Sequence, residues 1–134
     1  SLAEAARELG SRHVLVVHGH DGLDEISLSA PTDMAELKDG VISRSRIQPE
    51  DFGIARAPLA SLQINSVAEA LSAAEEVLQN RAGPRLDVVL LNAGAALYAA
   101  DVVPDMAVGV VLARDILKSG AAWNKWQELL GKNQ

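Results

Sequence analysis

The feature that most constrains this chain is a short apolar run, residues 13–17, that leads directly into a loop of glycines, histidines and acids. The run reads His-Val-Leu-Val-Val, and an unbroken, β-branched stretch of this length is typical of a strand with both faces buried. Apolar residues at helical spacing over 2–9 precede it, and Gly10 is a suitable helix end. A helix, a glycine turn and a buried strand in this order predict half of an α/β unit.

A buried strand needs hydrogen-bonding partners on both of its edges, and this chain offers few. Residues 59–64 are the best candidate for a further strand within the chain. The alternative is that the partner strands belong to sequence outside these residues. The pattern alone leaves both explanations open.

The rest of the chain predicts one hairpin and a series of helices. Residues 34–37 and 41–44 flank an Asp-Gly pair, Asp39-Gly40, which is a strong hairpin signal. Residues 49–53 predict a turn or a short helical start, and Asn65 or Ser66 is suited to cap a following helix, with Glu69 completing a capping box. Further helices are expected over 67–78, 86–100, 105–118 and 121–130. One strand, one hairpin and about five helices indicate an α/β fold.

Composition excludes several classes of protein. With 134 residues, 49% of them hydrophobic, the chain can form one modest core. It has no cysteine, which rules out disulfides and thiolate metal sites and fits a cytoplasmic location. A net charge of -6 argues against nucleic-acid binding, and no apolar stretch approaches the ~20 residues that span a bilayer. The N-terminus carries acids, unlike a targeting peptide, and its lack of Met favours a fragment.

The loop of residues 18–25, His-Gly-His-Asp-Gly-Leu-Asp-Glu, is the candidate functional segment. It follows the carboxyl end of the predicted strand, where ligands of open α/β sheets bind. Asp24 and Glu25 are consecutive oxygen donors of the kind that Mg²⁺ takes together with water and substrate phosphates. The alternative is that Asp24 simply caps a turn. His18 and His20 with Asp21 could suggest zinc or iron, but no further ligand stands at a supporting spacing.

Other candidate sites have a structural interpretation. The chain contains no G-x-S-x-G nucleophile elbow, no Walker loop and no G-x-G-x-x-G fingerprint. The small residues of 92–96 are expected to let their helix pack closely on a neighbour. Trp123 and Trp126 share a helix face and are expected to pack against the core or a partner.

Several motifs in order resemble those of the anthranilate phosphoribosyltransferases. Residues 18–25 resemble the family's H-G-x-x-G-[LI]-D-E signature. The other matching segments are its hairpin (32–37 and 39–40), its P-E-D-F-G segment (47–53), its D-x-V-x-L-N-A-x-A-A-L-Y helix (87–99) and its closing A-x-x-x-I-x-S-G-x-A segment (112–121). The resemblance covers nearly the whole chain. It implies the C-terminal portion of a nucleoside phosphorylase/phosphoribosyltransferase-like α/β domain, residues 1–134.

The resemblance implies transfer of the phosphoribosyl group from phosphoribosyl pyrophosphate to anthranilate, in tryptophan biosynthesis. Asp24 and Glu25 would then be ligands of the Mg²⁺ that positions and neutralises the leaving pyrophosphate. A cytoplasmic homodimer is expected for the full-length enzyme. The family's N-terminal helical domain and glycine-rich phosphate loop have no match in these residues, so the 134-residue chain alone is expected to be inactive. Residues 61–65 depart from the family pattern, which leaves the packing there open.

Two alternatives remain. One is a related enzyme such as a pyrimidine nucleoside phosphorylase, although those lack the D-G-L-D-E and P-E-D-F-G runs. The other is a non-catalytic relative that binds nucleic acid or protein. Retention of both acids and the negative net charge count against nucleic acid.

Overall fold

A computed structural model describes residues 1–131 as a three-stranded antiparallel sheet attached to a group of helices. The helices are α1 (Leu2–Glu8), α2 (Val67–Leu78), α3 (Pro84–Ala99), α4 (Met106–Lys118) and α5 (Ala121–Leu129), and the strands are β1 (His13–Gly19), β2 (Thr32–Lys38) and β3 (Val41–Ile47). Two short 3₁₀ helices, η1 (Pro49–Phe52) and η2 (Leu59–Leu62), join the sheet to α2. The predicted α/β fold is confirmed.

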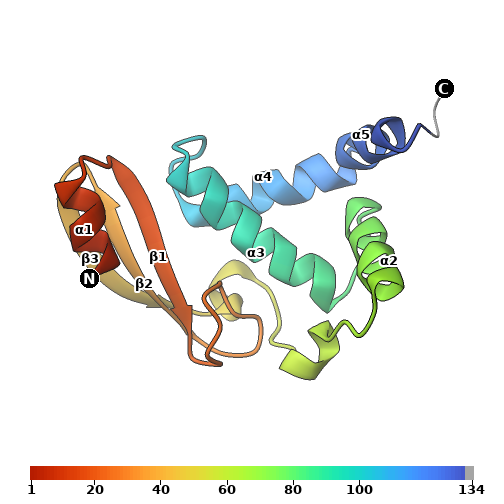
Figure 1. Ribbon diagram of the computed structural model, residues 1–134, viewed down its shortest axis with the longest axis horizontal. Coiled ribbons are helices and arrows are strands. Elements are labelled where there is room, and N and C mark those ends of the chain that lie inside the picture. The colour runs from red at the N-terminus through yellow and green to blue at the C-terminus, as the bar shows by residue number, and fades with distance from the viewer. Residues whose placement is uncertain (132–134) are drawn as a thin grey trace.

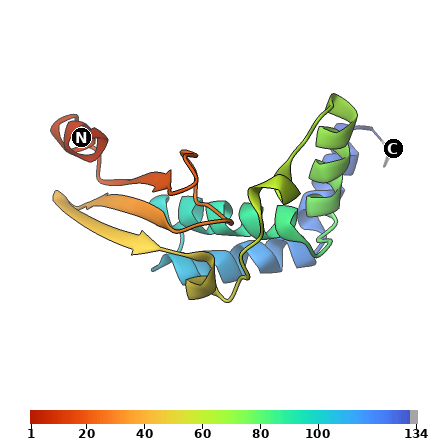
Figure 2. The same cartoon turned by 90° about the horizontal axis from the view of Figure 1, so that it is seen from below.

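The sheet and α1 lie at one end of the molecule, and α2 and α5 lie at the other, with α3 and α4 between them (Figure 1). Figure 2 shows α3 and α4 running side by side. Among the described residues, no helix is both long and apolar enough to cross a membrane.

The hairpin forms as its sequence predicts. β2 and β3 pair in register from Thr32 opposite Ile47 to Lys38 opposite Val41. Asp39 and Gly40 both have positive φ angles, 49° and 80°, which is the backbone of a type I′ turn. This turn matches the twist of the flanking strands and therefore fixes their register.

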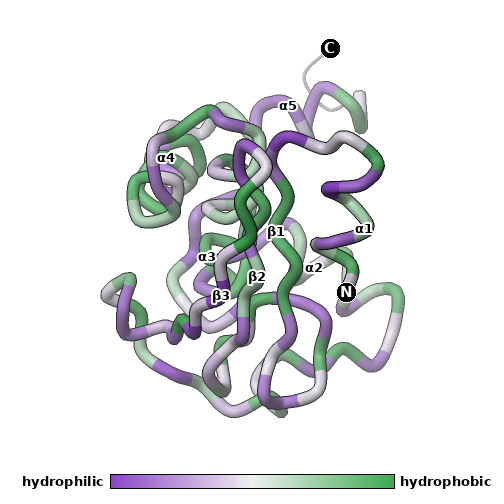
Figure 3. The backbone as a smooth tube through the Cα atoms, turned by 90° about the vertical axis from the view of Figure 1, so that its left-hand side faces the viewer, coloured by the Kyte–Doolittle hydropathy of each residue, from purple (hydrophilic) through white to green (hydrophobic). Residues whose placement is uncertain are grey.

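β1 is half-buried and, within residues 1–131, paired on one edge only. Its partner is β2, with His13 opposite Lys38 and Gly19 opposite Thr32. Leu15 and Val17 pack on the helical core. In Figure 3 the largely hydrophobic course of β1 runs beside β2, with α3 behind the sheet. The further strand considered for residues 59–64 does not form, because Leu59–Leu62 is the 3₁₀ helix η2 and Pro58 precedes it.

The helix ends follow local sequence signals. Ser66 caps α2, and its hydroxyl accepts the backbone N–H of Glu69 at 3.1 Å. The Glu69 carboxylate accepts the N–H of Asn65 at 2.7 Å and not that of Ser66, so Ser66 caps the helix as predicted but the predicted capping box does not form. Gly83 and Pro84 open α3, and Asp105 caps α4 through Val108.

One hydrophobic core joins the helices to the segment that follows residues 18–25, the loop that carries Asp21, Asp24 and Glu25 and is called the acidic loop below. Its buried members are Ile26, Leu28, Ile54, Val77, Leu86, Leu90, Leu91, Ala95, Met106, Val110 and Ala113. Ile26 and Leu28 are 3% and 1% exposed, and they come directly after Asp24 and Glu25 in the chain. The core therefore anchors one end of the acidic loop, while β1 anchors the other.

The small residues of α3 do permit close helix packing, as predicted. A Cβ atom on Gly94 would lie 2.7 Å from the backbone nitrogen of Val110 in α4. Trp123 and Trp126 are half-buried on α5, and the Trp126 indole N–H points to Glu75 of α2 at 3.5 Å. The predicted close packing of α3 is confirmed, whereas packing of the two tryptophans on the core stays a prediction.

Candidate functional site

The candidate site is the acidic loop, residues 18–25, which begins with the last two residues of β1 and ends before the buried Ile26. Gly22 has a φ of +93°, a conformation that favours glycine, and it makes the turn. The loop closes on itself, because the N–H of Gly19 donates to the carbonyl of Leu23 at 2.8 Å.

Asp24 and Glu25 both project into solvent from this loop. The side chain of Asp24 is 90% exposed, and its carboxylate is 3.0 Å from Nδ1 of His18. Glu25 is exposed and lines a surface hollow of about 490 Å³ beside η2. Within residues 1–131, no Lys or Arg lies at ion-pair distance from either carboxylate. The two acids thus retain free oxygen donors.

The two histidines of the loop contact different carboxylates. His18 lies beside Asp24, whereas Nε2 of His20 is 3.0 Å from Asp33 of β2. The Arg46 guanidinium also donates to Asp33, at 2.9 Å. These hydrogen bonds, from Arg46 first and His20 second, hold the pKa of Asp33 below its ordinary value. His18 and His20 therefore bind different carboxylates, Asp24 and Asp33, and their side chains do not meet at one point.

Asp21 has a structural role that the sequence did not reveal. Its carboxylate accepts the Ser27 hydroxyl at 2.6 Å, the Ser29 hydroxyl at 2.9 Å and the N–H of Leu23 at 3.1 Å. Partial burial acts to raise the pKa of Asp21, but these hydrogen bonds outweigh it and lower the pKa. Asp21 therefore stays ionised and ties the start of the loop to the segment beyond its end.

Asn92 of α3 holds the residue that follows Glu25. Its side-chain oxygen accepts the N–H of Ile26 at 3.0 Å, and its amide nitrogen donates to the carbonyl of Ile26 at 3.1 Å. The sequence pattern predicted only a packing role for this helix segment. An amide side chain within an apolar helix was the available signal, since a polar group in such surroundings needs a hydrogen-bonding partner.

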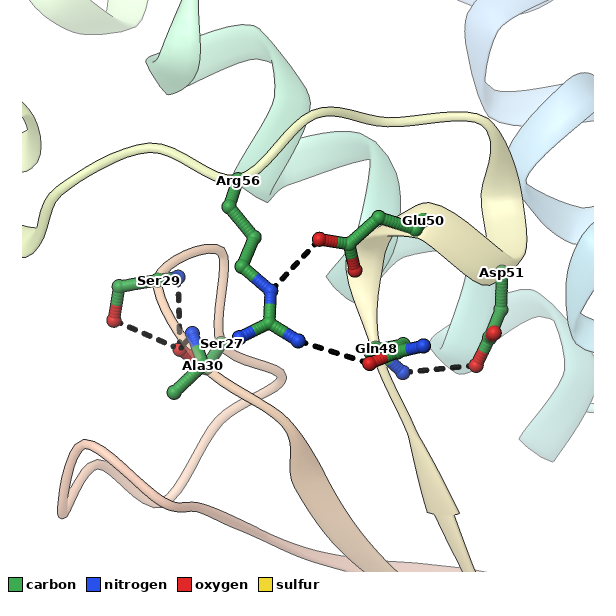
Figure 4. Close-up of polar contacts among 7 residues, drawn as sticks. All are labelled: Ser27, Ser29, Ala30, Gln48, Glu50, Asp51 and Arg56. Atoms are coloured by element: carbon green, nitrogen blue, oxygen red, sulfur yellow. Dashed lines mark hydrogen bonds and ion pairs between the residues drawn. The ribbon is translucent and has the colours of Figure 1, made fainter.

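The turn at η1 lies against the same segment. The backbone N–H of Gln48 donates to Asp51, and Arg56 donates to Glu50 at 2.7 Å and to Gln48 at 2.9 Å (Figure 4). The N–H of Ala57 then donates to the carbonyl of Leu28 at 3.2 Å. The chain after η1 is thus joined to the segment that follows the acidic loop.

The donor set fits a hard divalent cation in part. Carboxylate oxygens suit Mg²⁺, which typically takes one or two of them and completes its coordination with water and phosphate oxygens. Within residues 1–131, no three His, Cys, Asp or Glu side chains gather closely enough to enclose a metal. Asp24 and Glu25 would therefore supply part of a coordination sphere, and a phosphate-bearing ligand would supply the rest.

Comparison with known proteins gives consistent results. Residues 1–123 match the glycosyl transferase family, a/b domain. An anthranilate phosphoribosyltransferase of Acidithiobacillus ferrooxidans is 85% identical over 131 residues, which are 98% of this chain and 39% of that protein. The chain therefore spans about two fifths of the length of this relative.

Two solved structures have the same fold. The anthranilate phosphoribosyltransferase of Thermus thermophilus superposes with a TM-score of 0.81 at 38% identity, over 91% of this chain and 36% of that one. A Saccharomyces cerevisiae anthranilate phosphoribosyltransferase variant with Mg bound gives a TM-score of 0.78 at 25% identity, over 92% of this chain and 36% of that one.

Proposed function

The chain belongs to the glycosyl transferase family through its a/b domain, and on that premise we propose that it is part of an anthranilate phosphoribosyltransferase. The enzyme would transfer the phosphoribosyl group of phosphoribosyl pyrophosphate to anthranilate. The amine nitrogen bonds to C1 of the ribose, the bond from C1 to the pyrophosphate oxygen breaks, and the amine loses a proton. The 85% identity to the Acidithiobacillus ferrooxidans relative is the single observation that carries this proposal.

Within that reaction, Asp24 and Glu25 would hold Mg²⁺. When bound, the ion would offset the negative charge that accumulates on the departing pyrophosphate. The two exposed carboxylates would fix the donor by its pyrophosphate end. Support for this assignment comes from their exposed oxygens, which no Lys or Arg of residues 1–131 pairs, and from the Mg-bound yeast relative.

The other groups that bind the two substrates would come from the rest of the full-length protein. Because the chain covers 39% of the Acidithiobacillus relative, the phosphate-cradling residues and the anthranilate contacts are assigned to the rest of the full-length protein. A cytoplasmic homodimer that binds no nucleic acid is part of the same proposal. Light scattering of the full-length protein and a low-salt DNA mobility shift test these two points.

A chimera tests the reaction. The 131 matching residues of the Acidithiobacillus ferrooxidans relative are replaced by those of this chain, which restores a full-length protein. We expect this chimera to convert anthranilate and phosphoribosyl pyrophosphate to phosphoribosyl anthranilate only when Mg²⁺ is present, as followed by chromatography. A folded chimera without this activity contradicts the proposal.

Variants of the chimera test the metal ligands. Asp24→Asn with Glu25→Gln removes both charges at nearly constant shape, and we expect a loss of activity of at least about 100-fold. Asp115→Asn is the matched control, because Asp115 is an exposed acid on α4. Equal activity of the double variant and the control contradicts the assignment of Asp24 and Glu25.

A further inference from the structure

The shape of the acidic loop depends on the carboxylate of Asp21, which faces inward while Asp24 and Glu25 face outward. Its two oxygens receive the hydroxyls of Ser27 and Ser29 and the N–H of Leu23. Those donors come from both sides of Asp24 and Glu25 in the chain. Asp24 and Glu25 therefore lie on a segment whose two sides are joined by hydrogen bonds to the Asp21 side chain.

Gly19 provides the room for this carboxylate. A Cβ atom on Gly19 would lie 2.5 Å from Oδ1 of Asp21 and 3.2 Å from Cβ of Ser27. Its backbone does not have a positive φ, so the need for glycine here arises from close contact and not from conformation. The Asp21 carboxylate is thus packed against the backbone at the very end of β1.

Ser27 connects the Asp21 carboxylate to buried residues. Its hydroxyl donates to Asp21 and accepts the N–H groups of Ser29 and Ala30, at 3.0 and 3.1 Å (Figure 4). The Ser27 backbone N–H donates to the hydroxyl of Thr32 at 2.9 Å, and both side chains are buried. Beside it, Asn92 holds both backbone groups of Ile26. The segment after Glu25 is consequently fixed, and Asp21 fastens the loop to it.

We propose that Asp21 is a positioning residue that pre-forms the loop so that Asp24 and Glu25 receive a divalent cation bound to pyrophosphate. This inference rests on the proposed function. Asp21 would hold the loop and not the cation, since both of its oxygens already accept hydrogen bonds from the loop and the segment after it. A ligand pair held in place before binding loses less conformational freedom when the cation arrives, which strengthens binding.

The test uses the full-length chimera and the variant Asp21→Ala. Removal of residues that orient metal ligands typically costs about 10- to 100-fold in affinity or activity. We expect KM for phosphoribosyl pyrophosphate, and the dissociation constant for Mg²⁺ measured calorimetrically with inorganic pyrophosphate, to rise by about this factor. KM for anthranilate should stay unchanged. Asp21→Asn keeps one acceptor oxygen and should recover part of the loss.

Hydrogen exchange provides a readout that does not depend on the reaction. The N–H groups of Gly19, Gly22 and Leu23 are hydrogen-bonded within the loop, and we expect faster exchange there in Asp21→Ala. Ser29→Ala removes one of the three donors and should produce a smaller change in both exchange and Mg²⁺ affinity, even if Asp21→Ala fails to fold. Glu128→Gln, at an exposed acid on α5, is the control.

The outcomes separate the two proposals. Unchanged loop exchange or unchanged Mg²⁺ affinity in Asp21→Ala and Ser29→Ala overturns the positioning role, while an active parent chimera leaves the proposed function standing. An equal rise in KM for both substrates also overturns it, because that pattern indicates general destabilisation. Absence of Mg²⁺ binding and activity in the parent chimera overturns the proposed function and, with it, this inference.

Discussion

Gly94 of α3 and Gly109 of α4 face each other so closely that a Cβ atom on Gly109 would lie 2.4 Å from the carbonyl oxygen of Gly94. Real Cβ contacts with backbone do not reach this distance, so the two helices cannot keep their spacing if either glycine gains a side chain. The same two helices contribute Leu90, Leu91, Val110 and Ala113 to the buried core.

We expect Gly109→Ala to lower the free energy of unfolding. The added methyl group must push α3 and α4 apart, and overpacking of this kind costs about 1–3 kcal/mol, more than the gain in helix propensity of alanine. Guanidinium denaturation followed by circular dichroism measures the change. Val111→Ala, on the exposed side of the same helix, is the control and should change stability by less than about 1 kcal/mol. Equal stability of Gly109→Ala and the parent would disprove the close approach.

Ser66→Ala should weaken the start of α2 by about 1 kcal/mol, because it removes the side-chain oxygen that accepts the N–H of Glu69. Ser72 lies exposed in the middle of the same helix, so Ser72→Ala is a matched control and should be neutral or slightly stabilising. The comparison is made by the same denaturation measurement. If the two variants behave alike, Ser66 does not cap the helix.

Tyr98 is the chain's single tyrosine, so its ionisation can be followed directly by ultraviolet absorbance. Its hydroxyl donates to Glu36, and this hydrogen bond first, with burial second, raises the pKa of Tyr98 from 10.0 to about 12. His13 packs edge-on against the same ring, with centroids 4.7 Å apart. We expect a titration midpoint near 12 in the folded chain, and a midpoint that falls toward 10.0 in Glu36→Gln.

The same shift predicts how stability depends on alkaline pH. A group whose pKa is raised on folding stabilises the native state fully below its unfolded pKa and loses that contribution as pH rises through the folded pKa. The contribution of Tyr98 should therefore be complete below pH 10.0 and decline between 10.0 and about 12. Tyr98→Phe should remove this decline. A parent protein with a flat profile over the interval contradicts the Tyr98–Glu36 contact.

Asp24 and Glu25 should matter for binding and not for the fold. Because both side chains are exposed, Asp24→Asn with Glu25→Gln should alter the unfolding free energy by less than about 1 kcal/mol. In the full-length chimera, Mg²⁺ with phosphoribosyl pyrophosphate should raise the melting temperature of the parent but not of this double variant. A large loss of stability without ligand would show that the two acids have a structural role instead.

The sequence by itself determined the local elements and the place of the acidic loop. The strand at residue 13, the Asp39-Gly40 hairpin, the Ser66 cap and the order of the later helices follow from periodicity, turn residues and caps, which act over a few neighbouring residues. Asp24 and Glu25 were identified in the same way, as adjacent oxygen donors after a strand. Short-range chemistry sufficed for these features.

Only the tertiary structure decided how the loop is held. Asn92 lies 66 residues from Ile26, and nothing in the local pattern of an apolar helix specifies that its amide binds that backbone. Asp21 and Gly19 form one packed contact, which depends on the exact path of the chain between them. The 3₁₀ turn at η2, expected as a possible strand, is likewise set by its surroundings. Long-range hydrogen bonds and close packing depend on which segments meet in space, and that is why the two exposed acids could be picked out from the sequence while the contacts that hold their loop could not.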